Sequence, residues 1–356
     1  MKNFHTLQAR GQLNRLRQLA RAALADYAIV NPTFLPLRHE TNTTFRVQTP
    51  DGSTYVLRIH RPQGHTFEQI RSELQWLSAL RHDLKAAVPE PIPTRDGALL
   101  TIASAQGVPE PRICVLFRWL PGRFFNDTIT PGRMAHIGRL TALFHTHTSH
   151  WQAPSDFRRG RADALTEEGR QRDWRAPAAD QPATDVHPGG YDAAQAIAVV
   201  TTLCSSSDAA IVTAALERIR AVFHELGESR EVFGLIHGDL HQENYFFHGG
   251  SAGAIDFDDC GWGHFLFDLS ITLREIQDLP SYPALRAALL RGYRAVRPLP
   301  SDHERHLEAF FALRHIQILM WILESHDHPA FRDDWVAQAH YEIEQLRQFV
   351  IRGPIS

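Results

Sequence analysis

Two short stretches of the sequence decide the fold class. Residues 235–244 read Leu-Ile-His-Gly-Asp-Leu-His-Gln-Glu-Asn, and residues 254–259 read Ala-Ile-Asp-Phe-Asp-Asp. In the first stretch an apolar run delivers Asp239 to a glycine-containing loop, and Asn244 follows five residues later. Asp256 stands twelve residues beyond Asn244, at the end of a second apolar run. Phosphoryl transfer to a hydroxyl needs such groups, because a carboxylate must face the acceptor and a few oxygen atoms must hold the Mg²⁺ that bridges the nucleotide phosphates.

Composition sets the broad class of the protein. The 356 residues suggest about two domains, and 43% hydrophobic with 22% charged residues is typical of a globular chain. Lys and Arg number 37 against 40 Asp and Glu, a net charge of −3. This balance argues against nucleic acid or a membrane as a partner bound through bulk charge. The three widely spaced cysteines, with no signal-peptide pattern and no long apolar run, lead us to expect a cytoplasmic protein.

The first third of the chain is predicted to form a small sheet with helices. An amphipathic helix is expected around residues 13–24, and a capping box at Thr66 and Gln69 predicts a second helix over 67–81. Pro121 and Gly122 indicate a break after this region. The expected strands are the β-prone runs at 34–37, 43–49, 54–59, 98–103 and 112–117.

The remainder is predicted to be mainly helical. Residues 151–192 are rich in Arg, Asp, Pro and Gly, and we expect them to be an exposed insertion with little core. The block 232–267 interrupts the helices with short apolar runs. The apolar periodicity predicts helices at 131–147, 193–203, 208–226, 266–277, 282–295, 302–325 and 332–351.

The order of these motifs resembles the aminoglycoside phosphotransferase-like kinases, a family that includes choline kinases, homoserine kinases and stress-response kinase A. The resemblance covers roughly residues 30–330. It implies an α+β, bilobal protein-kinase-like fold, with a small antiparallel-sheet N-lobe at 1–118 and a larger, mainly helical C-lobe at 119–356. The supporting stretches are HGDLHQEN (237–244), IDFDD (255–259), GRLTALFHTHT (138–148), FDLSITL (267–273), HETNTTFRV (39–47), YVLRIHRP (55–62) and IRSELQWL (70–77).

The resemblance also implies roles for individual residues. Asp239 resembles the catalytic base, and Asn244 and Asp256 resemble the Mg²⁺ ligands. Arg58 stands where many relatives have a phosphate-binding Lys, and Glu73 resembles the helix Glu that pairs with that cation. Arg binds phosphates bidentately but is bulkier than Lys, so this position departs from the family pattern.

Other positions complete the expected site. Asn42, Thr43 and Thr44 occupy the nucleotide-covering turn without the glycines of protein kinases, so their hydroxyls and backbone N–H groups would hold phosphates. The connector from Phe117 through Trp119 to Leu120 would offer backbone groups to adenine. Three residues have expected supporting roles: Asp258, in place of a Gly, as a second metal contact or local hydrogen-bonding group, His237 as a loop support, and Asp268 as a buttress of the catalytic loop.

We therefore expect ATP- and Mg²⁺-dependent phosphorylation of a hydroxyl on a small molecule such as an amino alcohol, a homoserine-like compound or an aminoglycoside. A protein Ser/Thr kinase and a nucleotide-binding pseudokinase stay open as alternatives. A zinc metallohydrolase using His237, Asp239 and His241 is a third, although it gives Asn244 and Arg58 no function. Arg58 and Glu73 can also be surface residues, and Thr43 and Thr44 plain strand residues.

Overall fold

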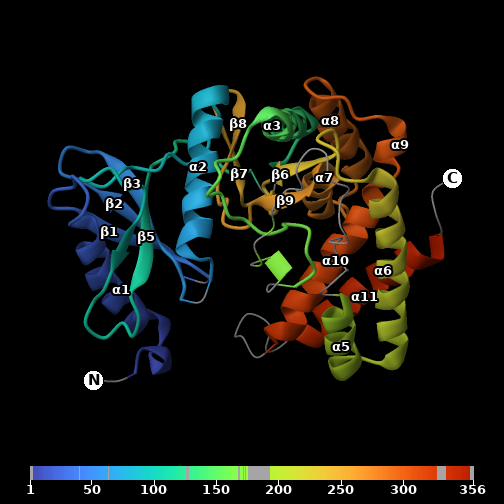
Figure 1. The fold of residues 1–356 in the computed structure, drawn as a ribbon, viewed down its shortest axis with the longest axis horizontal. Helices are drawn as coiled ribbons and strands as arrows, with labels where there is room; N and C mark the ends of the chain where they lie inside the picture. Colours follow the sequence, from blue (N-terminus) through green and yellow to red (C-terminus); the bar gives the residue numbers. More distant parts are fainter. Residues whose placement is uncertain are drawn as a thin grey trace. The chain divides into compact units, whose positions relative to one another are not determined.

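The computed structural model describes residues 3–39, 41–62, 64–125, 128–166, 169–170, 172, 174, 193–326 and 334–352. Residue contacts divide the chain into two compact units. Unit 1 comprises Met1–Gly122 and Ala153–Phe157, and unit 2 comprises Arg123–Gln152 and Arg158–Ser356. The predicted α+β class is confirmed, since one unit contains a five-stranded antiparallel sheet and the other is mainly helical (Figure 1). The assignment of residues 1–118 as a nucleotide-binding lobe stays a prediction.

The sheet of unit 1 has the strand order β1-β2-β3-β5-β4, and every neighbouring pair is antiparallel. β4 is shorter than the predicted run 98–103, because the N–H of Thr94 donates to the carbonyl of Ala98 in a turn before the strand begins. The strands are β1 (Thr33–His39), β2 (Thr43–Gln48), β3 (Thr54–Ile59), β4 (Thr101–Ala103) and β5 (Arg112–Arg118).

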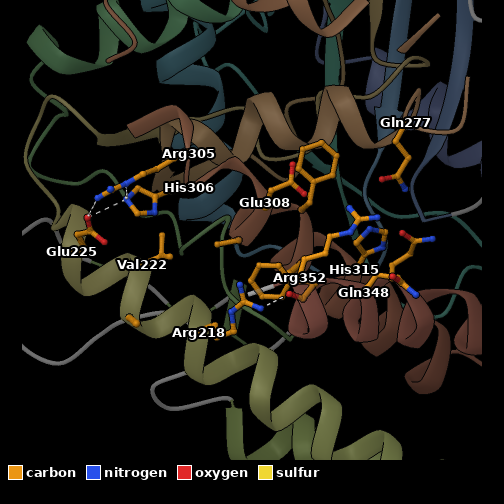
Figure 2. A pocket seen from close by; sticks show the side chains of 16 residues that line it. Arg218, Val222, Glu225, Gln277, Arg305, His306, Glu308, His315, Gln348 and Arg352 are labelled. Carbon is orange, nitrogen blue, oxygen red and sulfur yellow. Dashed lines mark hydrogen bonds and ion pairs between the residues drawn. The ribbon is translucent and has the colours of Figure 1, made fainter. Parts of the chain in front are cut away.

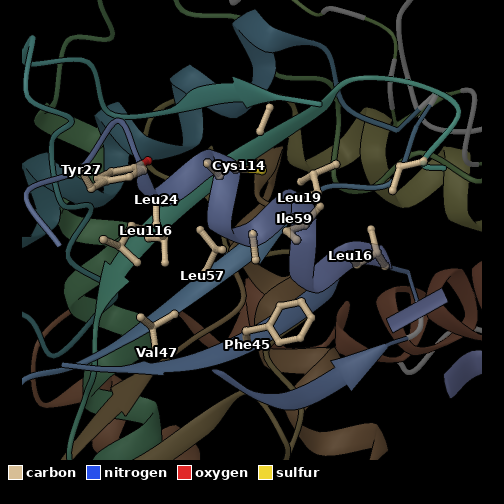
Figure 3. Close-up of a cluster of buried hydrophobic side chains, with 14 of the residues drawn as sticks. Leu16, Leu19, Leu24, Tyr27, Phe45, Val47, Leu57, Ile59, Cys114 and Leu116 are labelled. Carbon is tan, nitrogen blue, oxygen red and sulfur yellow. The ribbon is translucent and has the colours of Figure 1, made fainter. Parts of the chain in front are cut away.

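The two faces of this sheet carry different chemistry. Helix α1 (Ala9–Leu24), which follows the short 3₁₀ helix η1 (Phe4–Thr6), packs its apolar side onto one face (Figure 3). Leu57 and Ile59 of β3 lie in that core, and the alternation of side chains along a strand turns Arg58 to the opposite face. There Arg58 meets α2 (Phe67–Leu84), whose predicted capping box is present at its first turn.

Unit 2 surrounds two small antiparallel sheets with helices. β6 (Phe233–Ile236) pairs with β9 (Gly261–His264), and β7 (Tyr245–His248) pairs with β8 (Ser251–Ala254). No helix in the described ranges combines the length and the apolar character needed to cross a bilayer. The helices are α3 (Pro131–His150), α5 (Ala193–Leu203), α6 (Ser206–Leu226), α7 (Phe265–Arg274), α8 (Tyr282–Arg294), α9 (Ser301–Glu304), α10 (Leu307–Glu324) and α11 (Trp335–Arg352).

The prediction of one helix over residues 302–325 was wrong, because the chain forms α9 and α10 with a break between them. The N–H of His306 donates to the carbonyl of His303, three residues back, which interrupts the α-helical hydrogen-bond ladder. Both Arg305 and His306 then reach Glu225 of α6. The break lets α10 begin in a new direction.

The prediction of an exposed insertion was also wrong for residues 158–166. Arg159 and Arg161 are 2% and 5% exposed and Asp163 is fully buried. Arg159 donates to the carbonyls of Asp258 and Cys260, and Arg161 pairs with Asp163 at 2.8 Å and Glu228 at 2.6 Å. Composition did not reveal this burial because every charge has a partner elsewhere in the chain. Residues 167–168, 171, 173 and 175–192 lie outside the described part.

Candidate active site

A buried strand carries the candidate catalytic loop. β6 ends at Ile236, and His237, Gly238 and Asp239 follow it directly. Gly238 has φ +79°, and a Cβ at this position would lie 2.5 Å from the carbonyl oxygen of Asp259. Only glycine therefore permits the loop to pass so close to the chain that follows β8.

Asp268 of α7 holds this loop in place. Its carboxylate accepts the N–H of His237 at 2.9 Å and the N–H of Gly238 at 2.8 Å. His145 of α3 lies 3.1 Å from the same carboxylate, and the phenol of Tyr293 lies 2.9 Å from its other ring nitrogen. Burial of Asp268 opposes its ionisation, yet the hydrogen bond from His145, the charges of His145 and His237 and the N–H of Gly238 together outweigh burial and lower the pKa of the carboxyl. Asp268 thus occupies the buttressing position that the sequence resemblance implied.

The carboxylate of Asp239 is flanked by positive groups. Nη2 of Arg314 lies 2.5 Å from Oδ1, and Nε2 of His241 lies 3.3 Å from Oδ2. Burial raises the pKa of Asp239, but the charge of Arg314 and the hydrogen bond of His241 more than compensate and lower it below the usual value for Asp. Asp239 is therefore an anion at neutral pH, and 20% of its side chain is exposed to solvent.

The β7–β8 hairpin brings Asn244 and Asp256 together at its open end, opposite the turn. Asn244 precedes β7, Asp256 follows β8, and the N–H of Ile255 donates to the carbonyl of Asn244 at 2.8 Å. Nδ2 of Asn244 donates to the main-chain oxygen of Asp239 at 2.9 Å and to its Oδ2 at 3.2 Å. Asp256 is exposed and has φ +62°, a left-handed conformation that costs energy for a non-glycine residue and is found at functional sites.

These residues fit a divalent cation such as Mg²⁺. Because Nδ2 of Asn244 faces Asp239, its amide oxygen is directed elsewhere, as a metal ligand requires. Asp256 offers an exposed carboxylate from the neighbouring strand end. Mg²⁺ usually takes one or two carboxylates or amide oxygens and fills its other positions with phosphates and water.

The zinc alternative lacks a ligand set. Among the described residues, no group of three or more His, Cys, Asp or Glu side chains is placed to hold a metal ion. The two ring nitrogens of His237 already contact the carbonyl of Ile255 at 3.0 Å and the N–H of Asp239 at 3.3 Å. Burial lowers the pKa of His237, so its ring is neutral and supports the loop.

Unit 1 contains the predicted cation pair. Nη2 of Arg58 lies 2.7 Å from both carboxylate oxygens of Glu73, and the side chains are 7% and 1% exposed. The guanidinium carbon lies 5.0 Å from the ring centroid of Phe117, so the cation also stacks on an aromatic ring. A guanidinium has five N–H donors, and one arginine can therefore serve a carboxylate and a phosphate together.

The other predicted nucleotide contacts have partners within unit 1. Oγ1 of Thr43 lies 2.8 Å from Nδ1 of His39, and Thr43 and Thr44 both belong to β2. Oδ1 of Asn42 accepts the N–H of Arg61 at 3.1 Å. The N–H of Trp119 donates to the carbonyl of Thr54 at 3.1 Å, so this main-chain donor is engaged by the sheet. Their roles in nucleotide binding stay predictions, as does a metal role for Asp258, whose carbonyl accepts Arg159.

Sequence reasoning missed Arg314 and Gln317. Both lie on α10, where Nη1 of Arg314 is 3.2 Å from Oε1 of Gln317. Arg314 is separated from Asp239 by 75 residues, and no spacing rule connects a helix in this position with the catalytic loop. The one available signal is the polar group Arg314, His315 and Gln317 within the mainly apolar sequence of α10.

A separate cavity of about 620 Å³ lies among α6, α10 and α11, and none of the candidate site residues lines it (Figure 2). Its walls carry positively and negatively charged side chains, among them those of Arg218, Glu225 and Arg352. Arg314 is not among the α10 residues that line it, and the cavity is therefore distinct from the surroundings of Asp239.

Two relatives of this chain are named homoserine kinases. The chain is 30% identical to a homoserine kinase of Xanthobacter autotrophicus over 267 residues, which cover 72% of this chain and 69% of that protein. It is 31% identical to a homoserine kinase of Neisseria meningitidis serogroup B over 276 residues, with 75% and 74% covered.

Solved structures show the same fold. A microcompartment-associated aminopropanol kinase has a TM-score of 0.68 at 26% identity, with 93% of this chain and 94% of that chain covered. An amicoumacin kinase in complex with AMP-PNP, Ca²⁺ and Ami has a TM-score of 0.71 at 20% identity, with 98% and 95% covered. The protein-kinase-like fold predicted from the sequence is therefore confirmed.

The family model that describes the phosphotransferase enzyme family, APH, matches residues 33–305. This range includes Arg58 and Glu73 as well as Asp239, Asn244 and Asp256. The chain therefore belongs to the phosphotransferase enzyme family, and it is a phosphotransferase with an alcohol group as acceptor.

Proposed function

We propose that the protein transfers the γ-phosphoryl group of ATP to the hydroxyl of a small molecule in a reaction that requires Mg²⁺. One observation carries the proposal: Asp239, Asn244 and Asp256 come from one loop and one hairpin, with Asp239 held as an anion by Arg314 and His241. The homoserine kinases and the aminopropanol kinase that resemble this chain are named for small hydroxylated acceptors, which favours such an acceptor over a protein.

The proposed reaction assigns a task to each group. The acceptor hydroxyl donates a hydrogen bond to Asp239, its oxygen forms a bond to the γ-phosphorus, and the bond from that phosphorus to the β–γ bridging oxygen breaks. The low pKa of Asp239 makes it a weak base. It therefore orients the hydroxyl first and takes the proton only as the new O–P bond forms, in line with the loose transition state of this chemistry.

The remaining residues bind the cation and the phosphates and hold the loop that carries Asp239 in place. Asn244 and Asp256 would hold the cation, which when bound neutralises charge on the phosphates. Arg58, fixed by Glu73, would bind phosphate oxygens. Most of the rate enhancement in such reactions comes from positioning and charge stabilisation, which a rigid loop buttressed by Asp268 supplies.

A product assay tests this function. The protein is incubated with ATP, Mg²⁺ and panels of alcohols, amino acids, aminoglycosides and protein acceptors, and ADP and phosphomonoester are quantified by ³¹P NMR. We expect equal amounts of both products with at least one small alcohol, loss of turnover with EDTA, and recovery with added Mg²⁺. Binding of nucleotide without turnover of any acceptor would instead identify a pseudokinase.

A further inference from the structure

Arg314 is a charged neighbour of Asp239 that keeps this carboxylate ionised, and no contact with the acceptor has been assigned to it above. It projects from α10 and places Nη2 2.5 Å from Oδ1 of Asp239. Its side chain is 17% exposed and that of Asp239 is 20% exposed, so neither side chain is fully closed off from solvent. Arg314 lies beyond residue 305, where the match to the family model ends.

Gln317 holds Arg314 in this position. Gln317 is 2% exposed, and its Nε2 donates to the carbonyls of Ala162, at 3.0 Å, and Ala164. Because these two bonds use the amide nitrogen, the amide oxygen is turned toward Nη1 of Arg314. Two backbone carbonyls thus orient Gln317, and Gln317 orients Arg314. A group held in this way is preorganised for binding, unlike a solvated surface arginine.

The charges around Asp239 favour an anionic group on the acceptor. The guanidinium of Arg314 contacts one oxygen of Asp239, and the imidazole of His241 lies 3.3 Å from the other. Glu275 pairs with Arg274 at 3.1 Å, which offsets its negative charge. An ammonium group close to Arg314 would be repelled, whereas a carboxylate would match the planar fork of the guanidinium.

The geometry limits the size of the acceptor. With ordinary hydrogen-bond lengths, a hydroxyl bound to Oδ1 of Asp239 and a carboxylate oxygen bound to Nη2 of Arg314 lie no more than about 8 Å apart. A short carbon chain spans this distance. The two groups must therefore belong to a compact molecule.

We propose that Arg314 binds a carboxylate of the acceptor, so that the substrates of this enzyme are small hydroxylated carboxylic acids, amino acids included. The inference rests on the proposed function, because it takes Asp239 as the group that faces the acceptor hydroxyl. Arg314 is then the residue that distinguishes such an acid from the corresponding amino alcohol.

Three pairs of acceptors test this inference, and the two members of each pair differ only in the carboxylate. L-homoserine and 3-aminopropan-1-ol form one pair, and L-serine with ethanolamine and 5-hydroxynorvaline with 4-aminobutan-1-ol form two more. For at least one pair we expect the wild-type kcat/KM of the acid to exceed that of the amino alcohol by about 30-fold or more. A hydrogen-bonded pair of opposite charges stabilises a complex by enough to produce such a ratio. Arg314→Met should abolish this ratio, mainly through the KM of the acid, and Arg314→Lys should keep part of it. Any effect of the substitution on Asp239 itself acts on both acceptors and cancels in the ratio.

The outcomes separate the two proposals. Turnover of amino alcohols as good as that of the acids, or an unchanged ratio in Arg314→Met, would overturn the inference and leave the proposed function intact. An equal loss with all acceptors also leaves the ratio unchanged, and it would show that Arg314 acts through Asp239 or on the phosphates instead. Absence of ADP formation with every alcohol would overturn the proposed function. If the Met variant does not fold, the wild-type ratio still tests the substrate class, and a reduced ratio in Arg314→Lys tests the residue.

Discussion

Arg58 and Glu73 form a buried ion pair in unit 1. Their side chains are 7% and 1% exposed to solvent. Their attraction offsets the cost of removing two charges from water. If one partner is removed, the other is left as an uncompensated buried charge. The pair therefore contributes to stability as well as to the expected phosphate site.

We predict that Arg58→Met lowers the free energy of unfolding by about 3–5 kcal/mol, measured by urea denaturation. Arg58→Lys should lower the free energy of unfolding by less, because the positive charge is kept. Arg118 on neighbouring β5 is the control: it pairs with Glu90 at 3.0 Å but is 53% exposed. Arg118→Met should cost less than about 1 kcal/mol. Equal losses in the two Met variants would show that Arg58 and Glu73 are solvated.

At the residue level, the sequence was informative where spacing is fixed by local structure. Asp239, Asn244 and Asp256 were recognisable because a loop and a hairpin set their separation. Arg314 and Gln317 could not be found in this way, because their place beside Asp239 depends on how α10 packs in unit 2. Thr43 and Thr44 both belong to strand β2, and the hydroxyl oxygen of Thr43 lies 2.8 Å from Nδ1 of His39.

Among the helices, α3 and α8 pack with their backbones in unusually close approach. A Cβ on Gly138 of α3 would lie 2.0 Å from the carbonyl oxygen of Leu289, and one on Gly292 of α8 would lie 2.0 Å from that of Ala135. The same two helices supply His145 and Tyr293, which stand behind Asp268 and the catalytic loop. Their packing therefore supports the site.

We predict that Gly138→Ala destabilises the protein by more than about 2 kcal/mol, because backbone atoms must move to admit one methyl group. Gly132, in the first turn of the same helix, is a matched control, since a Cβ there meets no atom closer than 4.0 Å. Gly132→Ala should be neutral or stabilise by up to about 1 kcal/mol. Similar melting temperatures for the two variants, measured by circular dichroism, would contradict this account of the helix pair.

Elements with strong local signals could be predicted, and elements that depend on distant partners could not. The capping box of Thr66 and Gln69 correctly placed the start of α2, and the β-prone runs gave the strands of unit 1. The break before α10 was missed because it depends on contacts with Glu225 in α6. Residues 158–166 were misjudged because their arginines look solvated until their buried partners are known.

For the molecule as a whole, the expected tasks are divided between the two units. Unit 1 contains Arg58 and Glu73, and unit 2 contains Asp239 with the hairpin residues Asn244 and Asp256. The match to the family covers both groups but ends before Arg314. This division suggests that the shared phosphate chemistry resides in the matched part, whereas acceptor choice depends on the helical region that follows.

Single-turnover transfer from γ-labelled ATP to an accepted alcohol, compared between wild type and Asp239→Asn, tests the central claim most directly. The exposed Asp302 of α9 provides the control substitution Asp302→Asn. We predict that Asp239→Asn slows the transfer by about 10²-fold or more while nucleotide binding persists, and that Asp302→Asn reacts like wild type. Transfer by Asp239→Asn at the wild-type rate would contradict the role assigned to this carboxylate.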